Sequence, residues 1–485
     1  MSETTIDVQN GNNQIAPNAT IQQQNFYNLG IDFAEKLLRT QEYPLTLVVL
    51  GAGVDATLGL PTSSSLVPRI VEYLETDEGK AVDTALRKAI GNVRFHFDKF
   101  VNNAIDRLAK DLDKELLNIC RNITEELNHN TGLSDDQRKL GNLIVRLFSK
   151  IIDIKKGAAI DAETEMLIEE VLGTTVKDDT IIDFSHINYT ETFKSIIVDI
   201  LQKSMYEAEN PILRHVYKNI LDIEQLLSNY FYGFYTGQIS YVRDYLYISW
   251  ILWAYLVNEE QQRTQQVNEQ AGKPNLYAQL KDFASQLKDA TCQLLTFNYT
   301  SYASQCSNTA LYFHGSLTEY VDVENKNDFK LENLKEIDIE SFFKNQLATE
   351  ISFDPERKSI PIPSFMPPLK LQTIISKKYI DTWYQASQML LRANRIVILG
   401  YSFSSPDNFF CDYLRENRET QVVIIDKNME AVSRNVCRIL QLMPNRYSRQ
   451  VVNGVEQRRY DNRVTIVGAD LAEIELEKYM KYSNF

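Results

Sequence analysis

A glycine turn near residue 50 has the composition of a phosphate-binding loop. An apolar run of strand length, Leu45–Leu50, leads directly into Gly51-Ala52-Gly53, and an amphipathic segment follows from about Ser64 to Leu74. This order predicts a strand, a tight turn and a helix. Glycines let the backbone approach a ligand, and the free N–H groups at a helix N-terminus receive the negative charge of a phosphate. The chemistry predicted for this stretch is therefore the binding of a phosphate or pyrophosphate group.

Two polar clusters further along the chain also stand at the ends of strand-like segments. TFNYT at 296–300 is followed by FHGSL at 313–317, and GYSFSSPD at 400–407 follows the apolar run Arg395–Leu399. The carboxyl ends of parallel strands lie along one edge of a sheet, and ligands bind there. A single glycine-rich turn is weak evidence, but the three clusters together favour a ligand site.

A mostly parallel sheet is the element that would hold these clusters in place. Strand-like aliphatic segments alternate with amphipathic helical ones in the second half of the chain, which is typical of an α/β domain. The expected strands are 45–50, 291–299, 310–315, 395–399, 422–425 and 464–467, and the expected helices are 379–393, 408–415 and 471–482.

Composition divides the chain into four regions. Residues 1–25 are polar and rich in Asn and Gln, so they are expected to form a flexible arm, with an oligomerisation or partner-binding arm as the alternative. Residues 26–74, which open with a helix at Phe26–Arg39, and residues 289–485 are expected to form the two parts of the α/β domain. Residues 75–288 are helical in pattern almost throughout. They predict a large helical insertion that covers a ligand cleft or forms an assembly surface.

Two stretches inside the second part of the α/β domain stand apart. Residues 321–360 are acidic and irregular, so an exposed excursion is expected there. The run PIPSFMPP at 361–368 predicts a rigid extended segment, because proline fixes its own φ and restrains the residue before it.

Composition and charge disfavour several classes of function. The chain has 485 residues, a hydrophobic content of 44% and a formal net charge of −14, which fit a soluble globular protein and argue against a nucleic-acid partner. No apolar run reaches the ~20 residues that span a bilayer, and Tyr245–Val257 is expected to be a buried helix. The start lacks the pattern of a signal peptide, and the five cysteines form no CxxC pair. These features predict a reduced, cytoplasmic protein with no membrane partner, no zinc and no other metal site.

Several motifs, taken in order, resemble the SIR2-like proteins of bacterial anti-phage defence, a family of NADases. The matching pieces are GAGVDATLGLP, TFNYT, FHG, PPLK at 367–370, the helix that contains Trp383, and GYSFSSPD. The variant GLPTS at 59–63, Asp55 in the turn and NYT at 298–300 look like the AbiH branch of abortive-infection proteins. The resemblance covers residues 40–66 and 290–470 and leaves most of the helical insertion unaccounted for.

The resemblance implies a Rossmann-like domain that binds NAD and hydrolyses its nicotinamide–ribose bond. Asn298 matches the family's asparagine, which orients the ribose and the attacking water, and His314 matches the histidine that acts as general base or holds a ribose hydroxyl. An amide both donates and accepts hydrogen bonds, and an imidazole transfers protons near neutral pH, so both residue types suit these tasks. Sirtuin deacylases add a four-cysteine zinc module that this chain cannot build. NAD hydrolysis is therefore favoured over deacylation.

The same resemblance implies the remaining contacts with NAD as a substrate. They are divided among four parts of the dinucleotide. The residues are Gly51, Ala52 and Gly53 at the pyrophosphate, Asp55 near the nicotinamide ribose or the loop that covers it, Gly400, Ser402 and Ser404 at the adenosine half, and Asp426 at an adenine-ribose hydroxyl.

Two positions depart from the pattern of the family. Deacylase-like members usually have serine where Asp55 stands, and Thr300 replaces the aspartate of the commoner NYD motif. The Asp55 carboxylate is therefore left with two interpretations, a contact near the ligand or a helix N-cap. Thr300 weakens any expectation of charge-dependent chemistry at its position.

Structural interpretations also exist for the other candidate residues. They are Asn298 as a turn residue, His314 as a core histidine, Thr62 and Ser63 as caps of the following helix, Ser402 and Ser404 as hydroxyls of a plain turn, and Asp407 as the cap of a helix that begins at Asn408. His96, His129, His186 and His215 lack metal-like spacing and are expected to be structural.

The favoured function is an NAD+ hydrolase that acts as a regulated abortive-infection effector, since an enzyme that is always active would kill its own host. The resemblance implies a homo-oligomer and, as a further partner, a separate ATPase or phage-sensing protein. The alternative is a non-hydrolytic module that binds NAD or ADP-ribose as a sensor in a defence complex. A nuclease or nucleic-acid scaffold has little support, and Arg434, Arg438 and Arg446 are expected to be solvated.

Overall fold

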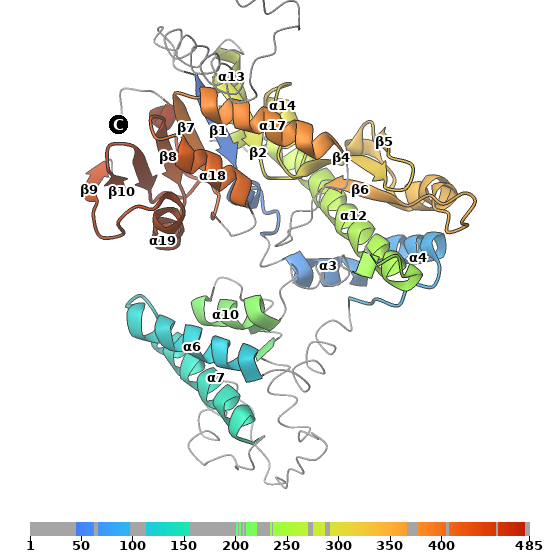
Figure 1. Cartoon of the computed structure of the whole chain (residues 1–485), viewed down its shortest axis with the longest axis horizontal. Coiled ribbons are helices and arrows are strands. Elements are labelled where there is room, and N and C mark those ends of the chain that lie inside the picture. Colours follow the sequence, from blue (N-terminus) through green and yellow to red (C-terminus); the bar gives the residue numbers. More distant parts are fainter. Residues whose placement is uncertain are drawn as a thin grey trace, which may run out of the picture.

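An eight-stranded sheet lies at the centre of the computed structural model (Figure 1). Its strand order is β3-β2-β1-β7-β8-β11-β10-β9, in which the first six strands are parallel and β10 pairs antiparallel with both β11 and β9. The strands are β1 Thr46–Leu50, β2 Cys292–Thr296, β3 Leu311–Tyr312, β7 Arg395–Leu399, β8 Gln421–Ile425, β9 Ser448–Val452, β10 Val455–Tyr460 and β11 Val464–Val467. The structure describes residues 45–62, 66–97, 113–154, 200–201, 203–204, 207, 210–220, 233–234, 236–269, 275–286, 292–365, 377–403, 407–452 and 454–480.

The central strands are buried on both faces. Every residue of β1 (TLVVL) and β7 (RIVIL) is buried, and such strands are almost continuously apolar in sequence. The predicted strands at 45–50, 395–399, 422–425 and 464–467 are confirmed. The register pairs Leu50 with both Thr296 and Leu399, and Leu399 with Ile425. The residues that follow these four strands therefore begin at the same edge of the sheet.

Helices cover both faces of the large sheet, which gives the Rossmann-like α/β architecture that the sequence predicts. On one face, a hydrophobic core joins the sheet to α17, α18 and α19, and on the other face a second core joins it to α13, α14 and residues 471–476. The bounds of these helices are α13 Leu276–Gln286, α14 Tyr302–Cys306, α17 Lys377–Arg392, α18 Asn408–Glu416 and α19 Met429–Leu440. The predicted helices at 379–393 and 408–415 are confirmed.

A second body packs around the long helix α12. Its residues 245–257 are all buried, as predicted, and in Figure 1 the helix runs diagonally from α4 toward the large sheet. It contacts α3, α4 and a small antiparallel sheet of strand order β5-β4-β6. The elements are α3 Leu66–Glu75, α4 Asp77–Ile90, α12 Ile239–Glu269, β4 Gly315–Asp322, β5 Asn327–Lys330 and β6 Pro361–Phe365.

The rest of the predicted insertion is also helical where the structure describes it. Helices α6 Asp113–His129, α7 Asp135–Ile154 and α10 Pro211–Ile220 pack against one another. A short helix, α2 Ala52–Ala56, begins within the predicted glycine turn, with Gly51 as its N-cap, and the predicted helix at 64–74 corresponds to α3. None of the helices in the described part combines the length and apolar content needed to cross a bilayer.

The prediction of an exposed, irregular excursion at 321–360 is wrong. This stretch contains the end of β4, strand β5 and the turns η1 Leu334–Glu336, α15 Ile339–Ser341, η2 Phe342–Leu347 and α16 Ala348–Glu350. Phe342 and Phe343 are buried against Trp250 and Trp253 of α12. The acidic composition of this stretch suggests exposure. Its apolar residues are buried by partners about ninety residues away, which a local pattern cannot reveal.

The predicted helix at 471–482 is wrong over its first half. Residues 471–476 form turns whose Leu471, Ile474 and Leu476 pack on the large sheet, and the helix α20 covers Glu477–Met480. Strands β9 and β10 and helix α19 have no counterpart in the prediction. The 1–25 arm, the 26–39 helix, Ser63, His186, the PPLK motif and Ser404 lie outside the described residues.

Candidate functional site

Two glycine turns interlock at the carboxyl edge of the sheet. The Gly51 N–H donates to Leu399 O at 2.9 Å, and the Gly53 N–H donates to Gly400 O at 2.9 Å. A Cβ on Gly51 would lie 2.4 Å from Gly400 O, and one on Gly53 would lie 2.7 Å from Gly400 Cα. Glycine is therefore required here by the close approach of the turn after β7. Two of the N–H groups in the predicted phosphate loop are already paired, and Ala52 between them is exposed.

Asp55 lies in α2 and turns its side chain into the protein, where it is 5% exposed. Its carboxylate accepts hydrogen bonds from the Tyr277 hydroxyl, from Asn298 Nδ2 at 2.9 Å and from Thr300 Oγ1 at 2.8 Å. Burial raises the pKa of Asp55 to about 6, although the three hydrogen bonds act in the opposite direction. The N-cap interpretation is wrong, because Gly51 occupies the N-cap position of α2 and Asp55 lies within the helix.

Asn298 joins the ends of the first two central strands. Its Nδ2 donates to Gly51 O at 3.0 Å as well as to Asp55, and both partners are acceptors, which fixes the orientation of the amide. Among the described residues, no group donates a hydrogen bond to its Oδ1. The side chain therefore bridges two strand ends and keeps one acceptor oxygen for another molecule.

The two positions that depart from the family pattern are in direct contact. Thr300 is 3% exposed and its hydroxyl donates to Asp55. Where the resembled family has a serine on the first loop and an aspartate on the second, this chain has the carboxylate on the first loop and the hydroxyl on the second. The two positions that differ from the resembled pattern are therefore joined by a hydrogen bond.

His314 has a carboxylate partner that the sequence reasoning missed. Its Nε2 lies 2.7 Å from Asp407 Oδ1, and the Tyr401 hydroxyl donates to the other oxygen of that carboxylate. Asp407 is 3% exposed and makes no side-chain hydrogen bond to the start of α18. Asp407 thus occupies the predicted N-cap position of α18, but its side chain bonds to His314 and Tyr401 and does not cap the helix. Because the carboxylate accepts the Nε2–H, the Nδ1 of the neutral imidazole carries the lone pair.

Phe297 connects the two polar groups. It directly precedes Asn298, its ring centroid lies 5.1 Å from that of His314, and it stacks on Tyr401 at 4.6 Å. Burial, together with the charge of Asp407, raises the pKa of the Tyr401 hydroxyl well above its usual range. Phe297 thus joins the His314 group to the residue next to Asn298, near the ends of β2, β3 and β7.

The residues predicted for the adenosine half are partly described. Ser402 is exposed, and its carbonyl accepts from Asn435 Nδ2 at 2.9 Å. Asp426 follows β8 and lies next to the glycine turn, since the Gly400 N–H donates to Ile425 O at 3.0 Å. Its Oδ1 accepts from the Asn428 N–H at 2.7 Å, and burial raises the pKa of its carboxyl group.

Titratable groups also pair elsewhere in the described residues. His215 of α10 lies 3.2 Å from Glu126 of α6, and both side chains are half-buried within the helical group formed by α6, α7 and α10. No three His, Cys, Asp or Glu side chains gather as metal ligands in the part of the chain that the structure describes. The five cysteines are free, and all but Cys306 are buried.

Solved structures of Sir2 proteins align with part of this chain. A Sir2 homologue in complex with NAD is 14% identical, with a TM-score of 0.25, over 40% of this chain and 71% of that one. A mutant Sir2 homologue in complex with ADP-ribose is 16% identical, with a TM-score of 0.27, over 40% of this chain and 75% of that one. No protein-family model and no curated protein sequence matches the chain.

Proposed function

We propose that the chain is an NAD+ hydrolase that converts NAD and water to nicotinamide and ADP-ribose. The observation that carries the proposal is the pairing of Asn298, with its remaining acceptor oxygen, and the His314–Asp407 pair around Phe297 at the carboxyl edge of a parallel sheet. Ligands of open α/β sheets bind at this edge. The order of motifs that resembles SIR2-like defence proteins supports NAD as the ligand.

Each side chain then has a defined task. The C1′–N bond of the nicotinamide riboside breaks, its electron pair goes to the nicotinamide ring nitrogen, and a water oxygen forms the new bond to C1′. Asn298 Oδ1 accepts from that water or from a ribose hydroxyl and so orients it. His314 accepts the proton of the water or hydroxyl at Nδ1. Asp407 holds the imidazole in this tautomer and stabilises the imidazolium, and Tyr401 holds Asp407.

The rest of the dinucleotide would extend along the same edge. Gly51, Ala52 and Gly53 would line the pyrophosphate, and Asp55 would lie beneath the nicotinamide ribose as the support of Asn298. Gly400, Ser402, Ser404 and Asp426 would contact the adenosine half. The close packing of Gly51 and Gly53 against Gly400 supports this arrangement.

In the cell, we propose, the protein is a cytoplasmic abortive-infection effector. Infection would release its activity, NAD would fall, and growth would stop before the phage spreads. A homo-oligomer, and a separate ATPase or phage-sensing protein, are the expected partners. These roles rest on the motif resemblance, and the hydrolytic chemistry does not depend on them.

Nicotinamide release from NAD by the purified full chain tests the hydrolase, with and without lysate of phage-infected cells. Asn298→Ala and His314→Gln should each lower the release at least about 100-fold and leave thermal unfolding cooperative. His215→Gln is the matched control, because His215 also faces a carboxylate, Glu126, but lies on the helical group. Its release should equal that of the native chain. If the native chain binds NAD but releases no nicotinamide under either condition, the non-hydrolytic sensor is correct.

A further inference from the structure

The end of α12 that faces the large sheet carries charged side chains that are buried. Glu260 is 2% exposed, and the side chains of Glu259 and Arg263 are 13% and 16% exposed. A buried charge is costly unless it is paired and hydrogen-bonded. The partners of these residues therefore indicate what this part of the helix holds in place.

Glu260 holds the loop that follows Asn298. One carboxylate oxygen accepts from the Ser301 N–H at 3.0 Å, and the other accepts from the Ser301 hydroxyl. Ser301 directly follows Thr300, which donates to the Asp55 carboxylate. Two residues of the site loop are thus fixed in succession, one to α2 and the next to α12.

Arg263 holds the loop that follows Asp55. Its Nε donates to Leu58 O at 2.8 Å, and its guanidinium forms an ion pair with Glu259 at 2.6 Å. The Leu58 N–H in turn donates to Asp55 O at 3.0 Å. Arg69 of α3 donates to the next carbonyl, Gly59 O, at 2.7 Å. The backbone that carries Asp55 is therefore held from outside the sheet by two guanidinium groups.

We infer that Glu260 and Arg263 are positioning residues, through which α12 sets the geometry of the two loops that carry Asp55 and Asn298. Neither belongs to the strand ends that form the site, so both act through other residues. The inference rests on the proposed function, because it ties the rate of NAD hydrolysis to the seating of α12. A movement of α12 would shift both loops together. Through this helix, a conformational change in the inserted region would alter the geometry of the site.

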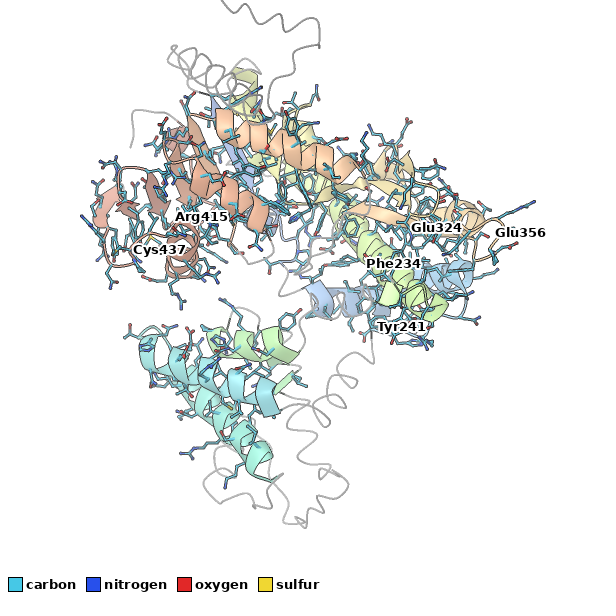
Figure 2. All side chains as sticks on the ribbon, viewed as in Figure 1. Phe234, Tyr241, Glu324, Glu356, Arg415 and Cys437 are labelled. Atoms are coloured by element: carbon cyan, nitrogen blue, oxygen red, sulfur yellow. The ribbon has the colours of Figure 1, made fainter. Side chains whose placement is uncertain are left out.

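The other end of α12 offers a natural control. There Arg243 donates to Gly91 O at 2.6 Å, and Asp244, 2% exposed, accepts from the backbone N–H groups of Arg94 and Phe95. These contacts have the same chemistry as those of the first pair, but their loop contributes nothing to the site. Arg243 and Arg263 are separated by about 30 Å along a helix that rises 1.5 Å per residue. In Figure 2, Tyr241 at that end lies well away from Arg415 and Cys437, on the helices that cover the large sheet.

The experiment compares two pairs of conservative variants in the full chain. Arg263→Lys and Glu260→Gln change the site end of α12, and Arg243→Lys and Asp244→Asn change the other end. We expect kcat for nicotinamide release to fall about 10- to 100-fold in the first pair, with KM within about twofold, and to stay at the native value in the second pair. Hydrogen exchange in residues 54–60 and 298–303 should accelerate in the first pair alone.

The outcomes separate the two proposals. Equal losses of kcat and of melting temperature in both pairs would mean that these residues only stabilise the fold, which would overturn the inference. Unchanged kcat and unchanged exchange in the first pair would overturn it as well. If the native chain does not hydrolyse NAD, the proposed function fails, and the exchange measurement still decides whether α12 holds the site loops.

Discussion

The buried carboxyl group of Asp55 makes a prediction about stability and pH. Its ordinary pKa of 3.8 is raised to about 6 in the folded chain, chiefly by burial. The folded state therefore binds this proton more tightly than the unfolded chain does. Between about pH 4 and pH 6, unfolding releases the proton, so the free energy of unfolding falls as the pH rises. The two pKa values differ by about two pH units at about 1.4 kcal/mol each, which gives a contribution of about 3 kcal/mol.

Asp55→Asn isolates this contribution. The amide can still accept from Tyr277 and Asn298 through its oxygen, but it cannot ionise. From pH 4 to pH 7, the free energy of unfolding of the native chain should fall by about 3 kcal/mol more than that of the variant. Urea unfolding at several pH values measures the difference. Parallel curves for the two proteins would refute the reasoning, because they would mean that burial does not penalise the ionised carboxylate.

Asp322 provides a control of opposite sign. Burial alone would raise the pKa of its carboxyl group, but hydrogen bonds from Ile360, Asn325, Ser359 and Glu324 lower it below the ordinary value. This carboxylate therefore adds stability above its unfolded pKa and loses it as the pH falls. Asp322→Asn should destabilise the chain at pH 7 and should reduce the loss of stability on acidification, the reverse of the Asp55 result.

Three further predictions concern the site. Asp407→Asn places an amide donor against the imidazole of His314 and favours the wrong tautomer, so kcat for nicotinamide release should fall about 100-fold with little change in KM; an unchanged kcat would exclude Asp407 from this role. Gly53→Ala puts a Cβ 2.7 Å from the backbone of the turn after β7. The free energy of unfolding, measured by thermal unfolding, should therefore fall by about 1–3 kcal/mol. Asp55→Ser and Thr300→Asp should each destabilise the chain, and the double variant should recover about 0.5–3 kcal/mol of the sum; additive losses would refute a coupling between the two positions.

The sequence predicted those parts of the fold whose pattern is local. Strands β1, β7 and β11 are covered on both faces, so each is a continuous apolar run that can be recognised without knowledge of its neighbours. Strands β9 and β10 were missed because SRQVV and VEQRRY lie at the edge of the sheet. All of β9 is exposed there, and no apolar alternation marks it.

Prediction of the candidate site was likewise limited to features that are visible in the local sequence. The motifs indicated Asn298, His314 and the glycine turns, because residue type and position at a strand end are visible in the sequence. The partner of His314 could not be recognised in the sequence, since Asp407 lies 93 residues away and directly before a helix. A local rule assigned that aspartate to capping. The tertiary contact with the imidazole and with Tyr401 takes precedence, because a carboxylate that is 3% exposed needs strong donors.

Tyr277 connects the predicted insertion with the candidate site. This region was expected either to cover a cleft or to form an assembly surface, and Tyr277 belongs to its last helix, α13. Its hydroxyl donates to Asp55 across a separation of 222 residues. Glu260 and Arg263 of α12 hold the loops on either side of the same carboxylate. Side chains of α12 and α13 therefore contact the loops that carry Asp55 and Asn298, which is the geometry from which we infer that α12 positions the site.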